Sequence, residues 1–591
     1  MLLQASPSKI VQLFLTGSAL LLIVAAQQEC KATTSATLRR VPPMVTANTW
    51  LPASIDLATI PTKDVVSHLD VAATDPPDDV VCSDEVAADD NNSSNYTLHP
   101  VVIGHMPQLR ATDAVRVVQA ARAAWSRGVW TNEYSSADRM QAIRNFLTKL
   151  KDMREELSEI LQWEIAKNAK DADAEVDRTI QFVEQVLDVV ASDPEFTGSW
   201  KTVGSYNVFT KRAALGVVLA LAPYNYPLNE CYAAVLPALI MGNVVVLKIP
   251  TTGGLVHLKT FRALAETLPE GTIHFISGSG RTTMPPVMKT GEIDALAFIG
   301  GSNAADKLIH DHPHPHRLKS FLQLEAKNIG LVLKDGWDDY ESNQAVLDAQ
   351  IQQLVTGSLS FNGQRCTAIK MIFVPKQYAD LIVAKLKDKV ERLHIGLPWE
   401  RHGDDAVLSS ITPLPYAGRL TYMRQLIKDA VTKGAKLITG GWLKGGADST
   451  LMALALLYPV QEGMRLYAEE QFGPVVAVGV YKEMDDVLEY SRRSEFAQQV
   501  AIFGSDPIAV ERLVTKWSSV YGKINWNVPT GRSPDTVPFS GRKSSALGVM
   551  SVRDGAMEFS VPTVVSMPKT QDPSGILGSP FFQAAEQYQS R

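Results

Sequence analysis

Residues 243–251 read Asn-Val-Val-Val-Leu-Lys-Ile-Pro-Thr. The run of valines is typical of a β-strand, because β-branched side chains suit the pleated backbone. Lys248 and Thr251 then fall at and just beyond the carboxyl end of that strand. Nucleotides commonly bind at such ends in open α/β sheets. The segment therefore predicts a strand whose end is a candidate nucleotide-binding edge.

Short β-rich runs of the same kind alternate with helical stretches along the chain. The first helical stretch begins at Ala111, with an apolar face at positions 114, 115, 118, 121 and 124, and a second amphipathic stretch covers 139–163. Strands that alternate with helices predict an α/β fold built on a parallel sheet. The other β-rich runs are 216–221, 272–276, 295–299, 330–332 and 371–374.

Composition limits the class of protein. The chain has 591 residues, of which 45% are hydrophobic and 20% charged, so it has material for several cores and reads as a multidomain globular enzyme. A net charge of −6 argues against broad nucleic-acid binding, which relies on many Lys and Arg contacts to phosphates. The four cysteines form no Cys-x-x-Cys pair and no Cys/His cluster, so neither a disulfide scaffold nor a metal site is predicted.

The amino-terminal region differs from the rest. Lys9 precedes an apolar run over 10–26, which predicts a targeting segment within 1–26: a signal peptide, the first part of a bipartite organelle signal or a signal anchor with membrane contact through 10–26. An amphipathic or buried helix is the structural alternative. Residues 27–98 are rich in Thr, Ala, Asp, Pro and Ser, which predicts a disordered linker.

Residues 361–367 read Phe-Asn-Gly-Gln-Arg-Cys-Thr and contain the candidate nucleophile. The guanidinium of Arg365 can favour the anionic form of the Cys366 sulfur, and Gly363 lets backbone and ligand approach closely. Most isolated cysteines are instead inert core residues. A working thiolate also needs a reducing compartment, such as the cytosol or an organelle stroma.

Two further segments accompany it. Residues 222–229, Ala-Pro-Tyr-Asn-Tyr-Pro-Leu-Asn, follow a β-rich run and precede a helical one, which predicts a strand-to-helix loop. Residues 469–474 read Glu-Glu-Gln-Phe-Gly-Pro. Either segment alone would be ordinary turn chemistry.

In combination these segments resemble the motifs of the aldehyde dehydrogenase superfamily, most closely those of the non-phosphorylating, NADP-dependent glyceraldehyde-3-phosphate dehydrogenases. The resemblance implies that the Cys366 thiolate adds to an aldehyde. It also implies that the Asn225 amide and backbone N–H groups stabilise the oxyanion that forms. Hydride would pass to NADP⁺, and water would release the acid without uptake of inorganic phosphate.

The resemblance also implies a cofactor site on a modified dinucleotide-binding fold. Lys248 would contact the adenosine ribose. Thr251 stands where NAD-preferring relatives often have a carboxylate that would repel a 2′-phosphate, so NADP is predicted and NAD stays open. The turn at 298–302 would place phosphates at a helix N-terminus. The remaining implied contacts are Gly300 and Ser302 for the pyrophosphate, Glu470 for the nicotinamide ribose and Phe472 for the nicotinamide.

Three arginines match the phosphate-binding positions of that subfamily. They are Arg178, Arg365 and Arg532, and Tyr226 matches a further substrate position. A planar guanidinium suits phosphate because paired donors meet paired oxygens, although any single arginine is more often a surface salt-bridge residue. The set implies glyceraldehyde 3-phosphate or a similar anionic aldehyde.

One departure from the family pattern affects thioester hydrolysis. The family has Leu-Glu-Leu-Gly-Gly-Lys, whereas this chain reads Leu-Gln-Leu-Glu-Ala-Lys over 322–327, so Gln323 replaces the glutamate that activates water. An amide cannot accept that proton. Glu325, two residues on, is our candidate replacement base through a local backbone adjustment. The alternatives are acyl transfer to coenzyme A or another thiol, and a weakly catalytic, membrane-tethered cofactor-binding protein.

The resemblance implies a three-part α/β architecture. A cofactor-binding domain would cover 99–322 and a catalytic domain 323–555. A hairpin at about 202–211 and a strand within 556–567 would form an oligomerisation element of a homodimer or homotetramer, and 568–591 would be a tail.

Overall fold

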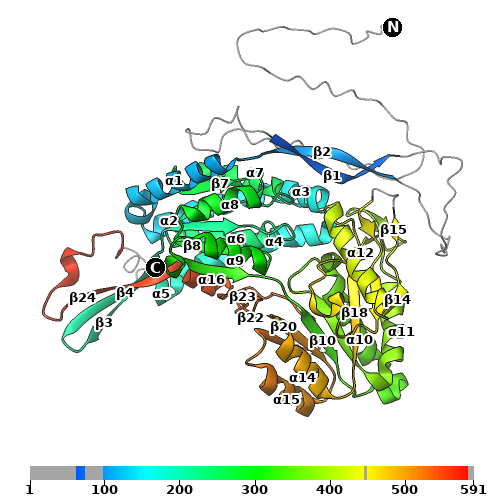
Figure 1. The fold of residues 1–591 in the computed structure, drawn as a ribbon. Coiled ribbons are helices and arrows are strands. Elements are labelled where there is room, and N and C mark those ends of the chain that lie inside the picture. Colours follow the sequence, from blue (N-terminus) through cyan, green and yellow to red (C-terminus); the bar gives the residue numbers. More distant parts are fainter. Residues whose placement is uncertain (1–61, 73–96, 445–448, 583–591) are drawn as a thin grey trace, which may run out of the picture. The chain divides into compact units, whose positions relative to one another are not determined.

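The computed structural model describes residues 62–72, 97–444 and 449–582 (Figure 1). In this part of the chain no helix is both long and apolar enough to cross a bilayer. The apolar run at 10–26 lies outside the described residues.

The first large sheet is predominantly parallel and six-stranded, in the order β23-β9-β8-β5-β6-β7. Four of its strands coincide with β-rich runs of the sequence, so those predictions are confirmed; β9 was not predicted. Only β23 runs antiparallel, beside β9. The strands are β5 (Val217–Leu221), β6 (Val244–Lys248), β7 (Ile273–Ile276), β8 (Ala295–Ile299), β9 (Lys319–Gln323) and β23 (Ala546–Leu547).

Helices cover both faces of this sheet, and alternate strand residues enter two different cores. Val217 and Leu219 of β5 pack with helices α1 and α8, whereas Val218 and Ala220 pack with α2, α4, α6 and α7. Burial on both faces explains why the strands are continuously apolar. The helices are α1 (Ala111–Arg127), α2 (Ser136–Asp152), α3 (Arg154–Ile165), α4 (Ala169–Ser192), α6 (Asn229–Ile240), α7 (Leu255–Thr267), α8 (Gly280–Lys289) and α9 (Ser302–Asp311).

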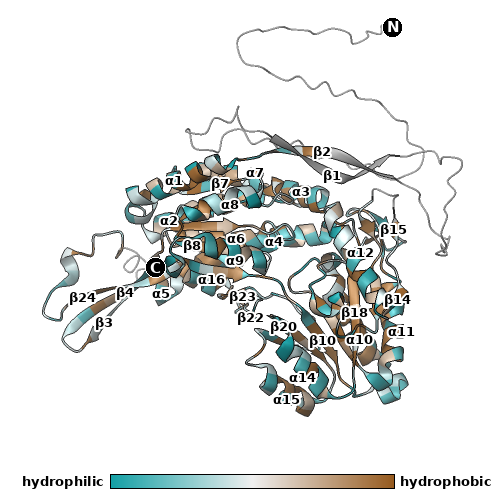
Figure 2. Cartoon of the chain, in the orientation of Figure 1, coloured by the Kyte–Doolittle hydropathy of each residue, from teal (hydrophilic) through white to brown (hydrophobic). Residues whose placement is uncertain are grey.

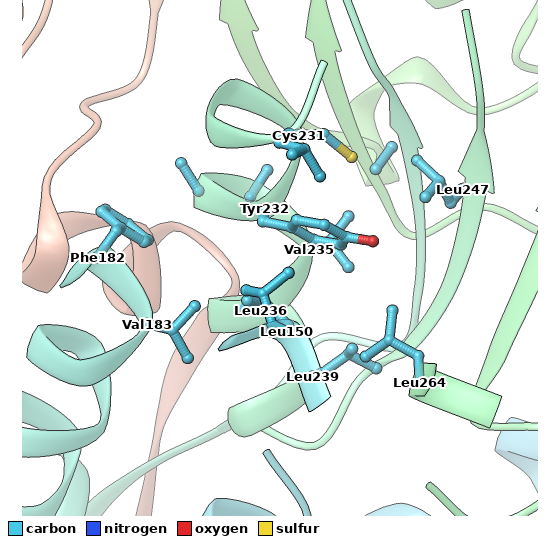
Figure 3. Packing of buried hydrophobic residues seen from close by; sticks show 14 of the residues in the cluster. Leu150, Phe182, Val183, Cys231, Tyr232, Val235, Leu236, Leu239, Leu247 and Leu264 are labelled. Carbon is cyan, nitrogen blue, oxygen red and sulfur yellow. The ribbon is translucent and has the colours of Figure 1, made fainter. Parts of the chain in front are cut away.

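The α6 side of the sheet contains a dense apolar core. Tyr232 of α6 lies at its centre, between Phe182 of α4 and Leu247 of β6 (Figure 3). Cys231 is buried in the same cluster, and burial raises the pKa of its thiol far above the usual range. Cys231 is therefore an inert packing residue, unlike the candidate nucleophile.

The second large sheet is seven-stranded, in the order β14-β17-β18-β11-β10-β20-β21. Only the β14–β17 pair is antiparallel. Both large sheets are mainly hydrophobic in Figure 2, with polar outer helix surfaces. The strands are β10 (Asn328–Val332), β11 (Ile369–Pro375), β14 (Lys436–Thr439), β17 (Ala455–Tyr458), β18 (Val475–Tyr481), β20 (Gln499–Phe503) and β21 (Lys523–Trp526), and the main helices are α10 (Tyr340–Leu359), α11 (Ala379–Val390), α12 (Ala417–Thr432), α14 (Met484–Arg493) and α15 (Pro507–Trp517). The predicted α/β class is confirmed.

A third, antiparallel sheet has the order β24-β4-β3. It joins β3 (Ser199–Val203) and β4 (Tyr206–Ala214), which form a hairpin, to β24 (Ser560–Pro568), with Ser560 opposite Ala214. The hairpin and the strand predicted for oligomerisation thus lie side by side, and β24 extends into the predicted tail. Phe582 of the tail packs on Trp200 and Phe209 of this sheet.

The amino-terminal region corrects one prediction. Residues 62–72, expected within a disordered linker, form β1 (Thr62–Ala72), which pairs antiparallel with β2 (Thr97–Pro107). The partner strand lies more than twenty residues away along the chain, and the surrounding composition, rich in Pro and Asp, concealed a strand that depends on this distant pairing.

The remaining elements are short. They are α5 (Pro194–Thr197), α13 (Arg465–Ala468), α16 (Val552–Glu558), and the two-stranded pairs β12 (Arg401–His402) with β13 (Val407–Leu408), β15 (Leu443–Lys444) with β16 (Leu451–Met452), and β19 (Phe496–Ala497) with β22 (Arg542–Lys543).

Candidate active site

A cavity of about 1200 Å³ collects most of the predicted site residues. It lies where loops following strands of both large sheets meet, which is where α/β folds place their sites. Lys248, Thr251 and Ser302 are not part of its wall. The predicted residues that line it are Arg178, Asn225, Tyr226, Gly300, Gln323, Glu325, Arg365, Cys366, Glu470, Phe472 and Arg532.

The turn before Cys366 has an unusual backbone. Phe361, Asn362 and Gly363 have φ values of 49°, 56° and 69°, in the left-handed region that most side chains avoid. A Cβ at Gly363 would lie 2.7 Å from the Ser358 carbonyl oxygen, so only glycine fits. The Asn362 side chain holds the turn, since its Nδ2 donates to the Thr412 carbonyl at 2.9 Å and its Oδ1 accepts from the Thr412 N–H at 2.9 Å. The predicted close approach of the backbone at Gly363 is confirmed, whereas the approach of a ligand there stays a prediction.

The electrostatic setting of Cys366 differs from the expected one. Burial raises the pKa of the Cys366 thiol to about 11, and the carboxylates of Glu230 and Glu470 add to this rise. The cation that lowers this pKa is Lys370, while the Arg365 guanidinium donates instead to the Gly357 carbonyl at 3.2 Å. The thiol is therefore mostly protonated near neutral pH, chiefly because it is buried.

Lys370 itself was missed by the sequence reasoning. It is fully buried on β11, and its ammonium lies 3.1 Å from the Cys366 carbonyl oxygen and 3.3 Å from a Glu470 carboxylate oxygen. A lysine in a strand gives no sequence signal of such a role. Its partner Glu470 also accepts a hydrogen bond from the Ala326 N–H at 3.1 Å.

Asn225 is held in a fixed position beside the nucleophile turn. Its Nδ2 donates to the Gln364 carbonyl at 2.8 Å, and its own backbone carbonyl accepts from Lys167 Nζ at 2.8 Å. Lys167 forms a fully buried ion pair with Glu175, which also accepts a hydrogen bond from the Leu228 N–H at 3.0 Å. An amide NH₂ has two hydrogens, so the second can serve an oxyanion in the cavity.

Tyr226 and Phe472 form aromatic parts of the wall. Tyr226 lies under the ammonium of Lys167, 3.5 Å from the ring centroid, and meets Phe361 edge to face. Phe472 has a φ of 44° and packs edge to face on Tyr224. The Lys370 ammonium and the Arg419 guanidinium also lie over this ring, 5.7 and 5.6 Å from its centroid.

Two of the three arginines predicted to bind phosphate, Arg178 and Arg532, are paired with carboxylates. Arg178 forms a bidentate ion pair with Asp535, in which both N···O distances are 2.7 Å. Arg532 contacts Asp535 at 3.0 Å through Nε and Glu230 at 2.7 Å through Nη1. Arg532 is only 6% exposed, and its buried Nη2 has no hydrogen-bond partner in the described structure, so a donor is left for a ligand anion.

Glu230 and Asp535 were not predicted as site residues. Asp535 follows Arg532 by three residues, and Glu230 lies in the first turn of α6, five residues after Asn225. Burial opposes ionisation of Asp535, but the hydrogen bond from Arg178 and the charges of both arginines lower its pKa overall. These carboxylates offset part of the positive charge of the subsite.

Gln323 occupies the position of the missing glutamate without any local backbone adjustment. It ends β9 in register with Ile299 of β8 and Ala546 of β23. Its side chain is 2% exposed, and neither amide atom has a hydrogen-bond partner in the described structure. β9 is regular up to Gln323, and Glu325 lies beyond its end.

Glu325 lies instead at the cofactor turn. Its Oε2 accepts a hydrogen bond from the Ser302 N–H at 2.8 Å, at the start of α9. Gly300 and Gly301 precede this contact, and a Cβ on Gly301 would lie 3.0 Å from Glu325 Oε1. The carboxylate thus occupies the helix N-terminus where the sequence placed the pyrophosphate.

Lys248 and Thr251 lie near each other but beyond the cavity. Lys248 ends β6 and is buried, which lowers its pKa to about 8, while Thr251 is exposed in the following loop. The glycine turn at 300–301, the N-terminus of α9 and the Glu470 carboxylate are of the kinds that fit a dinucleotide.

Several known proteins are similar to this chain in sequence and in fold. The model of the aldehyde dehydrogenase family matches residues 88–565. The NADP-dependent glyceraldehyde-3-phosphate dehydrogenase of Streptococcus equinus is 30% identical over 460 residues, which cover 76% of this chain and 90% of that protein. The vanillin dehydrogenase of Pseudomonas fluorescens is 32% identical over 340 residues, covering 57% and 66%.

Among solved structures, the NADP-dependent glyceraldehyde-3-phosphate dehydrogenase from Bacillus halodurans C-125 complexed with NADP has a TM-score of 0.70 and 29% identity. The match covers 79% of this chain and 94% of that one. The chain therefore belongs to the aldehyde dehydrogenase family, and it is an oxidoreductase that acts on aldehydes.

Proposed function

We propose that the protein oxidises glyceraldehyde 3-phosphate, or a similar small anionic aldehyde, to the carboxylic acid with NADP⁺. The observation that carries the proposal is the grouping, in one cavity, of Cys366, the Asn225 amide and three arginines. The cysteine supplies a nucleophile, the amide a donor for the oxyanion, and the arginines a subsite for phosphate.

In this reaction the Cys366 thiolate adds to the aldehyde carbon, and the oxygen becomes an oxyanion that the Asn225 amide stabilises. Loss of hydride then leaves an acyl thioester on Cys366. When bound, NADP⁺ supplies the hydride acceptor. Glu470 and Phe472 would hold its nicotinamide end, Gly300 and Ser302 its pyrophosphate, and Lys248 its adenosine ribose.

NADP is the proposed cofactor because Thr251, at the strand end, introduces no carboxylate against a 2′-phosphate. The relative from Streptococcus equinus is named NADP-dependent, and the Bacillus halodurans structure is a complex with NADP. NAD, which lacks the 2′-phosphate, stays an alternative cofactor.

Release of the acid needs a base that Gln323 cannot be. We assign this role to Glu325, which lies two residues further along the chain and lines the cavity. Because hydrolysis follows hydride transfer, Glu325→Gln should preserve a single burst of NADPH and abolish steady turnover. A steady rate equal to that of the unaltered protein would exclude Glu325 as the base.

The amide at Gln323 also favours a second candidate function. Without a base at that position, the thioester could pass its acyl group to coenzyme A or another thiol. Rate stimulation by coenzyme A and formation of an acyl thioester product would distinguish this reaction from hydrolysis.

The test uses the full chain with glyceraldehyde 3-phosphate and NADP⁺, without coenzyme A or inorganic phosphate, and follows NADPH by absorbance. Sustained NADPH formation supports hydrolytic oxidation. A burst that stops, and resumes on addition of coenzyme A, supports the acyl-transfer reaction. Cofactor binding with no thioester would support the weakly catalytic, tethered alternative.

We also propose a homodimer or homotetramer assembled through the β24-β4-β3 sheet. Its surface exposes Val203, Tyr206, Val561 and Val564, which are 61%, 56%, 44% and 57% exposed. A strand edge with exposed apolar residues favours pairing with another chain. The acidic substitution Val564→Asp should dissociate the oligomer in sedimentation experiments.

A further inference from the structure

The carboxylate of Glu325 spans from the end of β9 to the beginning of α9. One oxygen accepts the Ser302 N–H at 2.8 Å, and the other lies beside Gly301, where an added Cβ would come within 3.0 Å of it. Gly301 is the N-cap of α9 and has no side chain to cap the helix. Glu325 therefore provides the cap from a distant segment of the chain.

This cap has the same chemistry as a bound phosphate. Exposed N–H groups and the helix dipole favour an anion at the N-terminus of the ten-residue helix α9. The Ser302 N–H cannot donate fully to both a carboxylate and a phosphate, and two anions at one turn repel each other. The Glu325 carboxylate and a dinucleotide pyrophosphate would therefore compete for the N-terminus of α9.

A second, independent observation lies two residues away. Gln323 is 2% exposed and lines the same cavity, yet both of its amide atoms lack a hydrogen-bond partner in the described structure. A buried amide without partners is costly. Gln323 therefore offers a donor and an acceptor to a group that enters the cavity.

We propose that Glu325 is an internal competitor of the dinucleotide, and that the pyrophosphate displaces its carboxylate from α9 into the cavity towards Gln323. The inference rests on the proposed function and deepens it. Two consequences follow. The affinity for the dinucleotide is lower than it would be with the glycine that the family motif has at this position. The Glu325 carboxylate also becomes available as a base at the thioester only once the cofactor is bound.

The experiment measures dinucleotide binding without any aldehyde. The full chain is titrated with NADP⁺ and, separately, with NAD⁺ by isothermal calorimetry, in the unaltered form and as Glu325→Gln and Glu325→Gly. The control is Glu495→Gln, which removes an equal charge from an exposed position on the wall of the same cavity. Thermal unfolding of each variant verifies that it is folded.

Both Glu325 variants should bind both dinucleotides about tenfold more tightly, the order expected for removing one charge-assisted hydrogen bond that competes at a helix N-terminus. The control should match the unaltered chain. Equal or weaker binding by folded Glu325 variants would overturn the inference, while leaving the proposed function intact if the unaltered chain binds NADP⁺.

Two other outcomes also decide the matter. A gain in affinity for NADP⁺ but not for NAD⁺ would mean that the Glu325 carboxylate opposes the 2′-phosphate. That result would contradict the proposed competition with the pyrophosphate. Failure of every variant to bind either dinucleotide would overturn the inference together with the proposed function.

Discussion

Replacing Glu230 with glutamine should improve the use of a phosphorylated aldehyde. In the structure Glu230 lies 2.7 Å from Arg532, with side chains 13% and 4% exposed. Two unit charges at this distance attract by about 6 kcal/mol at an effective dielectric constant of about 20. Desolvation of the two buried charges offsets most of that energy.

We take about a quarter of this attraction as the energy that a substrate phosphate must overcome when it binds Arg532. Glu230→Gln then strengthens phosphate binding by about 1.5 kcal/mol, which is a factor of about ten in affinity. The KM for glyceraldehyde 3-phosphate should fall about tenfold. Unphosphorylated glyceraldehyde is the matched control, because its KM should not fall.

A second readout follows from the thiol. The negative charge of Glu230 raises the pKa of Cys366, so its removal lowers that pKa and increases the thiolate fraction at a fixed pH. Iodoacetamide should then alkylate Cys366 faster, as mapped by peptide mass spectrometry. An unchanged or higher KM for the phosphorylated substrate, with a folded variant, would refute Arg532 as a phosphate ligand restrained by Glu230.

Three further results follow from the site. Asn225→Ala should lower kcat by a factor of about 10²–10³ through loss of an oxyanion donor, while the alkylation rate of Cys366 stays within about twofold; a similar fall in both would indicate a misplaced nucleophile instead. Lys370→Met should cost about 3–5 kcal/mol of unfolding free energy in urea titrations, because the largely buried Glu470 carboxylate loses its cation and keeps only the Ala326 N–H. The same variant should slow alkylation, since the charge of Lys370 lowers the pKa of Cys366, and faster alkylation would contradict this assignment. Because the pKa of Cys366 is raised to about 11, the rate of alkylation should rise about tenfold per pH unit between about pH 7 and 10, and a plateau below pH 8 would show a preformed thiolate.

The sheet strands were predictable because their signal is local. Apolar runs such as 244–248 and 295–299 specify strands buried on both faces, and the structure has β6 and β8 there. The same argument failed for 62–72, where stability depends on pairing with the distant β2. The single helical stretch predicted for 139–163 is two helices, which meet at Met153.

The chemistry of the site was predictable only where the family motifs fix it. Cys366 and Asn225 are brought together as the motifs imply, through the contact of the Asn225 amide with Gln364. The pairing of Arg532 with Glu230 joins residues about 300 positions apart, so no sequence spacing predicts it. Glu325 follows β9 and contacts Ser302 at the start of α9. This contact depends on the sheet order that places β9 beside β8.

The most direct test of the central claim is to trap the acyl group on Cys366. The full chain is mixed with glyceraldehyde 3-phosphate and NADP⁺, quenched in acid within the first turnover and digested for peptide mass spectrometry. We predict a phosphoglyceroyl adduct on the peptide containing Cys366, with one NADPH formed per adduct, and neither product with Cys366→Ser. NADPH formation that persists in Cys366→Ser, or an adduct on another cysteine, would contradict the account.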